Sequence, residues 1–134
     1  MAQNLSSRSV LLVDDDAFLL DLYARKFQQS GFSVVKADTA DEALGKLRDG
    51  LSPEAVVFDI VMPHIDGYEF LEIMNKERLA PSAVKIALSN QTSEEDVKRA
   101  KSLGAQACIG KASAIPSETV EQVLAIMNNR SSSL

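Results

Sequence analysis

The side chains that could do chemistry in this sequence each follow a short apolar run. Three consecutive aspartates, 14–16, follow one run, Asp59 follows another, and Ser89 and Lys111 follow two more. Carboxylates that gather at one place repel each other unless a cation compensates their charge. A hard divalent ion with oxygen ligands meets that need, and a site with few protein ligands and open water positions favours Mg²⁺ over Ca²⁺.

Such a cluster suits phosphoryl transfer. One carboxylate can attack phosphorus if a metal ion and a cation neutralise the charge on the equatorial phosphoryl oxygens. Lys111 follows the last apolar run and is placed to be that cation. The Ser89 hydroxyl is placed to donate a hydrogen bond to the same phosphoryl group. These residues therefore predict a Mg²⁺ site with an aspartate nucleophile.

The apolar runs that must position these side chains alternate with stretches of helical spacing. The predicted strands are residues 10–13, 32–35, 55–58, 84–88 and 105–109. The first and third runs are continuous, which is typical of strands covered on both faces in a parallel sheet. The alternation predicts a doubly wound α/β fold with right-handed crossovers. Ligands of such sheets bind at the carboxyl ends of the strands, where the first and third strands are expected to be neighbours.

Helix starts are visible between the strands. Thr39 with Glu42, and Thr92 with Glu95, each form a capping-box pattern ahead of apolar residues. Pro116 suits the first turn of the last helix. The apolar face of the fourth helix is expected to be fully buried in the core.

The composition favours a single folded domain and argues against several partners. The chain has 134 residues, 46% of them hydrophobic, and a formal net charge of −5. Nucleic acid or an anionic membrane would need a basic patch, so neither is expected as a direct partner. Cys108 is the only cysteine, which excludes an intramolecular disulfide. The sequence shows no signal peptide and no apolar run of about 20 residues, so we expect a cytoplasmic protein.

The chemical residues and their flanks resemble the receiver domain of two-component response regulators. The resemblance is carried by LVDDD (12–16), VFDIVMP (57–63), DG (66–67), LS (88–89) and Lys111, and by their spacing. It implies a flavodoxin-like (βα)5 domain at residues 9–129, with strand order 2-1-3-4-5 and flexible tails at 1–8 and 130–134.

The resemblance also implies roles for the site residues. Asp59 is the phosphoacceptor, Asp15 a direct Mg²⁺ ligand and Asp14 a ligand through water. The backbone carbonyl of Val61 completes the protein's share of the metal coordination.

Ser89 and Lys111 are expected to contact the phosphoryl group by the same resemblance. A histidine kinase or a histidine phosphotransfer protein would donate that group to Asp59. A downstream protein would then bind the face formed by the fourth helix, fifth strand and fifth helix. We expect a stand-alone receiver that acts on its own aspartate and is not a turnover enzyme.

Several positions depart from the usual receiver pattern. Cys108 stands where the fifth strand usually carries an aromatic residue that swings inward when the Ser/Thr moves. Ala112 replaces a proline, and a cis bond before alanine would cost about 3–4 kcal/mol. Asn90 replaces a small residue beside the site and narrows access to it. Val61 and Gln91, at positions that tune hydrolysis in the family, carry no base, which predicts a long-lived phosphoryl group.

Two other functions compete with the receiver. A phosphatase of the haloacid dehalogenase type also uses a strand-end aspartate and Mg²⁺, but it needs a second aspartate where this chain has Val61. A pseudo-receiver would bind partners without phosphorylation. The retained carboxylates argue against it, whereas Cys108 and Ala112 leave it open.

Some candidate residues also have simple structural explanations. Asp16 suits the N-cap of the first helix as well as a role in shaping the metal pocket. Asp66-Gly67 reads as a turn, and Met62-Pro63 as a loop that fixes the backbone beside Asp59. His64 lies in that loop without a second histidine or cysteine nearby, which favours an exposed residue over a ligand.

Overall fold

The computed structural model describes residues 8–90, 93–111 and 116–132, and it contains the alternating elements that the sequence predicts. The strands are β1 (Ser9–Val13), β2 (Ser33–Ala37), β3 (Ala55–Asp59), β4 (Val84–Ser89) and β5 (Ala107–Gly110). The helices are α1 (Ala17–Gln29), α2 (Ala40–Arg48), α3 (Gly67–Glu77), α4 (Glu94–Ser102) and α5 (Pro116–Ser132). No helix among the described residues is long and apolar enough to cross a membrane.

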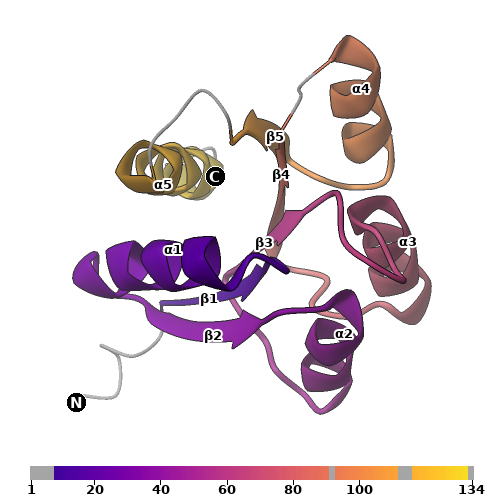
Figure 1. Ribbon diagram of the computed structural model, residues 1–134, viewed down its shortest axis with the longest axis horizontal. Helices are drawn as coiled ribbons and strands as arrows, with labels where there is room; N and C mark the ends of the chain where they lie inside the picture. Colours follow the sequence, from indigo (N-terminus) through magenta and orange to yellow (C-terminus); the bar gives the residue numbers. More distant parts are fainter. Residues whose placement is uncertain (1–7, 91–92, 112–115, 133–134) are drawn as a thin grey trace.

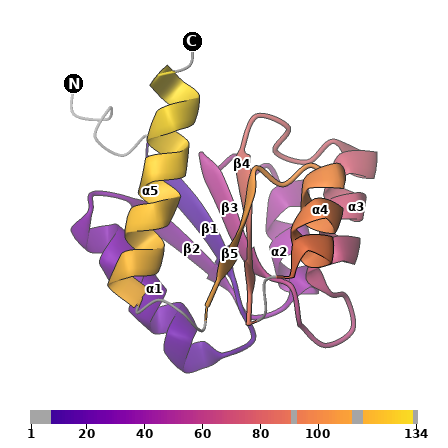
Figure 2. The ribbon, with the colours of Figure 1, turned by 90° about the horizontal axis from the view of Figure 1, so that it is seen from above.

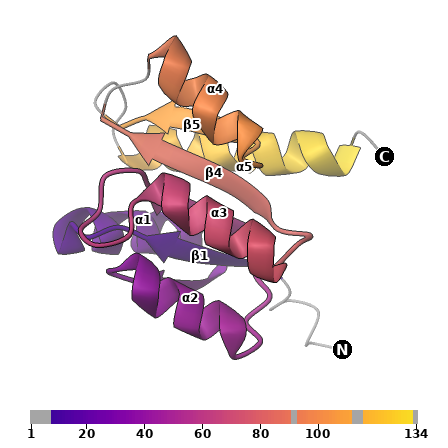
Figure 3. The same cartoon turned by 90° about the vertical axis from the view of Figure 1, so that its right-hand side faces the viewer.

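The strands form one parallel sheet in the order β2-β1-β3-β4-β5, which confirms the predicted doubly wound fold. Helices α1 and α5 cover one face and α2, α3 and α4 the other (Figure 1). Figure 2 shows α5 lying beside α1, and Figure 3 shows the other three helices in a row. Each face therefore has its own apolar core, with alternate residues of every central strand contributing to one core or the other.

The strand pairing brings the carboxylates together. Strands β1 and β3 are neighbours, and Val13 pairs with Phe58. Asp14 and Asp59 come directly after these two residues, so they leave adjacent strands at the same level. All five residues of β3 are buried, which explains the continuous apolar run and holds the end of the strand firmly in place.

The other half of this edge comes from β4 and β5. Ser89 ends β4 opposite Gly110 of β5, and Lys111 follows Gly110 directly. The backbone N–H of Lys111 donates to the Ser89 carbonyl over 2.6 Å. The serine and the lysine are therefore held side by side, at the ends of β4 and β5, and β4 pairs with β3.

The helix caps agree with the sequence in all but one case. Thr39 Oγ1 accepts from the Glu42 N–H over 3.0 Å at the start of α2, as predicted. The predicted cap of α4 at Thr92 was wrong. That residue lies outside the described part of the chain, and the N-cap of α4 is Ser93, which accepts from the Asp96 N–H over 3.1 Å. Adjacent residues with the same capping ability make such a start ambiguous by one position.

Helix α4 is held much less deeply than we expected. Ala100 is its buried residue, and Val97 is only half-buried. By contrast, α3 buries five residues, including Tyr68 and Phe70. The expectation that the apolar face of α4 is fully buried was wrong. The helix packs over β5, a four-residue edge strand that offers little surface for burying apolar side chains.

The described residues extend into both predicted tails, 1–8 and 130–134. The Arg8 guanidinium pairs with Glu54 over 2.9 Å and lies 4.6 Å from the centroid of the Phe32 ring. Helix α5 continues to Ser132. The rest of the predicted tails, residues 1–7 and 133–134, falls outside the described residues.

Candidate functional site

A buried cation lies between two buried carboxylates at the carboxyl edge of the sheet. Lys111 Nζ is 3.0 Å from Asp14 Oδ2 and 3.4 Å from Asp59 Oδ2. None of the three side chains is more than 7% exposed. Asp15 is exposed, and one carboxylate oxygen from each of the three aspartates lies within 4.8 Å of the others. The structure thus brings together Asp14, Asp15, Asp59 and Lys111, as the sequence predicts.

The two buried carboxylates differ in how well they are satisfied. Asp14 accepts from the Asp16 N–H through Oδ1, over 2.9 Å, and from Lys111 through Oδ2. Asp59 contacts Lys111 through Oδ2, but its buried Oδ1 has no hydrogen-bond partner among the described residues. A buried, unpaired carboxylate oxygen costs free energy. Asp59 is therefore the group in this cluster that gains most from an added cation or a new covalent partner.

The protonation behaviour of Asp59 follows from this environment. Burial raises its pKa, the Lys111 ammonium lowers it, and the Asp14 carboxylate raises it again, to about 6. Burial of Lys111 lowers the pKa of its ammonium, but Asp14 and Asp59 outweigh that effect and the pKa is raised overall. One cation thus offsets only part of the negative charge around Asp59.

The residues present fit a divalent cation. Asp59 Oδ1 is unpaired, Asp14 is fixed by its backbone contact, and the exposed Asp15 leaves room for water. Oxygen ligands with open water positions suit Mg²⁺. Asp14, Asp15 and Asp59 would hold the ion, which supplies positive charge to phosphoryl oxygens. The side chain of Val61 is 67% exposed, and the ligand role of its backbone carbonyl stays a prediction.

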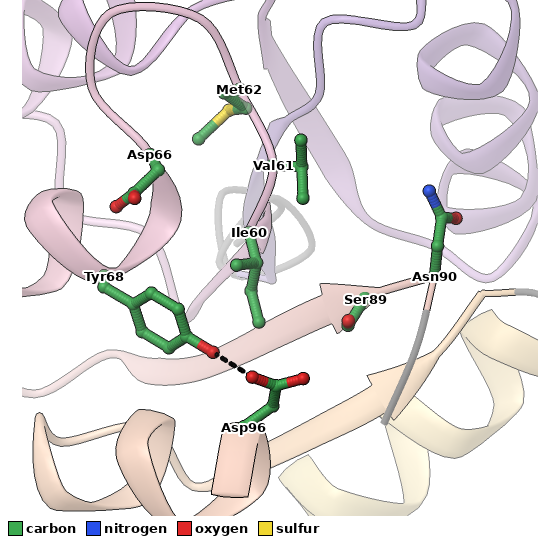
Figure 4. A pocket seen from close by; sticks show the side chains of 8 residues that line it. All are labelled: Ile60, Val61, Met62, Asp66, Tyr68, Ser89, Asn90 and Asp96. Atoms are coloured by element: carbon green, nitrogen blue, oxygen red, sulfur yellow. Dashed lines mark hydrogen bonds between the residues drawn. The ribbon is translucent and has the colours of Figure 1, made fainter. Parts of the chain in front are cut away.

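Ser89 borders a cavity next to the segment that follows Asp59. The Ser89 residue is 6% exposed and lies at the end of β4. The cavity has a volume of about 500 Å³ (Figure 4). Its lining comes from the segments after β3 and β4 and from the starts of α3 and α4: Ile60, Val61, Met62, Asp66, Tyr68, Ser89, Asn90 and Asp96. The space lies next to Ser89, the side chain that is predicted to move.

Gly67 is a site residue whose role the sequence did not reveal. Its N–H donates to the Ile60 carbonyl over 2.8 Å. A Cβ at this position would lie 2.7 Å from Ile60 Cα and 2.8 Å from the Asp59 carbonyl oxygen. The start of α3 therefore lies directly against the backbone of Asp59 and Ile60. The sequence indicated only a turn here, and the one available signal was the glycine itself.

The remaining candidates fall outside the carboxylate cluster. Asp16 caps α1 by accepting from the Phe18 and Leu19 N–H groups, which confirms its structural reading. His64 is exposed, as expected, and adopts a positive φ of 67°. Gln91 and Ala112 lie outside the described residues, so the peptide bond at 111–112 and the contacts of Gln91 stay untested.

The fold and site together define a flavodoxin-like α/β domain with an acidic site at the carboxyl ends of its strands. Residues 10–123 match the response regulator receiver domain. The chain belongs to this family of two-component signalling domains.

Individual relatives agree with this assignment. The chain is 27% identical over 121 residues to the phosphate regulon transcriptional regulatory protein PhoB of Escherichia coli, covering 90% of this chain and 52% of PhoB. It is 30% identical over 119 residues to the response regulator SaeR of Staphylococcus aureus, covering 89% and 49%. The chain thus spans about half the length of these curated relatives.

Solved structures cover nearly the whole fold. The chemotaxis response regulator CheY4 of Vibrio cholerae has a TM-score of 0.81 at 25% identity, with 91% of this chain and 99% of CheY4 covered. A CheY-like receiver domain protein from Methanospirillum hungatei has a TM-score of 0.82 at 29% identity, with 96% and 100% covered. The prediction of a stand-alone receiver stays a prediction beside these two kinds of relative.

Replacing Gly67 with alanine is expected to destabilise the protein by about 1–3 kcal/mol, because the new Cβ must displace backbone atoms of Asp59 and Ile60. Gly45→Ala is the matched control. Nothing lies within 4 Å of a Cβ there, and alanine in a helix gains roughly 0.5–1 kcal/mol over glycine. Urea unfolding measures both free energies, and equal effects of the two substitutions would contradict the proposed close contact.

Asp59→Asn is expected to stabilise the metal-free protein near neutral pH. The folded-state pKa of about 6 lies above the ordinary aspartate value of 3.8, so the folded state binds the proton more tightly and wild-type stability falls as the pH rises between these values. Asparagine does not titrate, so its advantage should grow over the same interval, to roughly 1–3 kcal/mol above pH 6. Urea unfolding in a chelator at several pH values tests this, and an advantage independent of pH contradicts it.

Proposed function

We propose that this chain is a Mg²⁺-dependent phosphoacceptor and that Asp59 receives a phosphoryl group from a phosphohistidine of a kinase or phosphotransfer protein. The observation that carries the proposal is the Asp59 carboxylate. It is buried, one of its oxygens is unpaired, and it lies beside Lys111 and two further aspartates. Membership of the receiver family supports the same role.

The proposed reaction is an in-line displacement at phosphorus. A carboxylate oxygen of Asp59 forms the new O–P bond while the P–N bond to the donor imidazole breaks, and the electron pair of that bond leaves with the imidazole. Lys111 neutralises charge on the phosphoryl oxygens, and the Ser89 hydroxyl donates a hydrogen bond to one of them. The chain modifies its own aspartate and does not turn over an external substrate.

Lys111 is prepared for this task before any phosphoryl group arrives. Its ammonium is already buried against Asp14 and Asp59, so little reorganisation is needed when negative charge develops nearby. Its backbone bond to Ser89 keeps the two phosphoryl-binding side chains on adjacent strands. This preorganisation favours a phosphoacceptor over the pseudo-receiver alternative.

The surface around the site suits a protein donor. Phe18 is 72% exposed and Val61 is 67% exposed, and they are the large hydrophobic residues most exposed in the described part of the chain. Phe18 lies in the first turn of α1 after the aspartate run, and Val61 lies two residues after Asp59. Exposed apolar side chains that flank a reactive group are typical of a docking surface. The downstream target is proposed to bind the face formed by α4, β5 and α5.

Incubation with acetyl phosphate and Mg²⁺ is expected to add one phosphoryl group, seen as a mass increase of the intact protein. Asp59→Asn should abolish the adduct because it removes the nucleophile. Asp49→Asn, which changes an exposed aspartate after α2, should leave it unchanged. An adduct that persists in Asp59→Asn, or none in the wild-type protein, would overturn the proposed function.

The adduct is expected to last well beyond seconds once the donor is removed. Val61 presents an exposed alkyl group beside the site, and neither it nor Gln91 carries a carboxylate that could orient the attacking water. Val61→Glu, which adds such a group, should shorten the lifetime. Loss of the added mass with time measures both rates, and a wild-type half-life of only seconds would show that another group orients the water.

A further inference from the structure

A hydrogen bond between α3 and α4 closes one side of the cavity beside Ser89. The Tyr68 hydroxyl donates to Asp96 Oδ1 over 3.1 Å (Figure 4). The guanidinium carbon of Arg99 lies 4.0 Å from the centroid of the Tyr68 ring. Tyr68 is 7% exposed and Asp96 is half-buried, so the bond is only partly open to water. These three side chains form one polar and aromatic contact, here called the α3–α4 latch.

The latch joins the two segments that carry the phosphoryl chemistry. Tyr68 is the second residue of α3 and follows Gly67, which presses against the Asp59 backbone. Asp96 lies in the first turn of α4, which follows the segment after Ser89. The Ile60 N–H also donates to the Leu88 carbonyl over 3.0 Å. The two partners of the latch are therefore linked to the two site residues: Tyr68 to Asp59 through Gly67, and Asp96 to Ser89 along the chain.

The latch is a large part of what holds the near end of α4. Ala100 is the residue that this helix buries fully. At its far end, Asn75 of α3 donates through Nδ2 to the Leu103 carbonyl. Helices α3 and α4 are thus tied at both ends, once beside the phosphoacceptor and once away from it. Loss of the near tie alone would allow α4 to tilt about the far one.

Cys108 on β5 lies near both partners of the latch hydrogen bond, Tyr68 and Asp96. Cys108 is half-buried on β5, and the Asp96 carboxylate is close enough to raise the pKa of its thiol, although burial contributes more. No ring from β5 fills the cavity, and Tyr68 is the aromatic residue that lines it. A tyrosine released from Asp96 has room there to change its orientation.

We propose that the α3–α4 latch holds α4 in the arrangement of the unphosphorylated protein and that phosphorylation of Asp59 opens it, with Tyr68 as the moving aromatic residue. This inference rests on the proposed function of Asp59. Movement of Ser89 toward the phosphoryl group displaces the start of α4, while Gly67 holds the backbone at the start of α3 against Asp59, so that only the Tyr68 side chain turns. The Tyr68–Asp96 bond is the contact that must then break.

Linkage gives this proposal a measurable consequence. Phosphorylation favours the open latch in this proposal, and where the open form is the one that reacts, opening the latch by mutation raises the reactive population and with it the rate of phosphorylation. Tyr68→Phe keeps the ring and removes the hydroxyl. It should speed formation of the Asp59 adduct from acetyl phosphate and Mg²⁺ by about three- to tenfold, the range expected for loss of one partly exposed hydrogen bond of typical net strength. An unchanged or slower rate would overturn the latch.

Asn75→Ala is the matched control because it breaks the other tie between the same two helices. Its contact with Leu103 lies at the end of α4 away from Ser89. Its rate of adduct formation should stay close to that of the wild-type protein, even where urea unfolding shows a loss of stability. An acceleration equal to that of Tyr68→Phe would show a general loosening of α4 and would overturn the specific role of Tyr68.

A second readout follows Tyr68 itself. The chain has no tryptophan and two tyrosines, so Tyr23→Phe leaves Tyr68 as the sole strong fluorophore. Hydrogen bonding to a carboxylate quenches tyrosine emission. Phosphorylation with acetyl phosphate and Mg²⁺ should therefore raise the emission, and an added Asp96→Asn substitution should raise it before any donor is present. Constant emission in a protein shown by mass to be phosphorylated would contradict latch opening.

The phosphoacceptor role and the opening of the latch are contradicted by different results. A wild-type protein without an adduct contradicts the phosphoacceptor role. A wild-type protein that forms the adduct, with Tyr68→Phe and the emission both unaffected, contradicts only the latch.

Discussion

The structure depends on an uneven charge balance in a buried place. Lys111 lies between Asp14 and Asp59, all three shielded from water, with Asp15 close by. One ammonium cannot neutralise three carboxylates, and burial weakens the screening that water would provide. The sheet enforces this proximity, because neighbouring parallel strands that end at the same level must release their next residues together. The fold thus holds charges that would separate if they were free to do so.

That charge imbalance explains why the aspartates of the site must be held firmly in place by their neighbours. Asp14 is held by a backbone N–H from the start of α1, and the Asp59 backbone is held by the close approach of Gly67. Each contact prevents a carboxylate from turning out to solvent. The free energy for this restraint comes from the two apolar cores, which bury β3 along its full length. The strained site is supported by parts of the molecule that have no chemical role.

Much of this arrangement was predictable because it follows from the spacing of the apolar residues and from the strand order. Continuous apolar runs predicted the strands, and the rule that parallel strands end at one edge predicted the meeting of Asp14, Asp59, Ser89 and Lys111. The sequence could not predict features that depend on distances between elements. The contact of Gly67 with Asp59, the Tyr68–Asp96 bond and the shallow packing of α4 all join residues whose neighbours are set only in three dimensions. Ser93 was missed for a local reason, since two adjacent residues cap equally well.

The shallow packing of α4 contrasts with the rigid carboxyl edge of the sheet, which carries the buried charges. A site that stores unbalanced charge can transmit a change of charge only through an element that moves at low cost, and deeply buried helices such as α3 resist movement. Helix α4 lies over a short edge strand, buries one alanine fully and follows the segment that carries Ser89. It is therefore the element that the charge at Asp59 can displace most easily. Cys108 is consistent with this role of α4, because it places a small side chain on β5 near Tyr68 and Asp96.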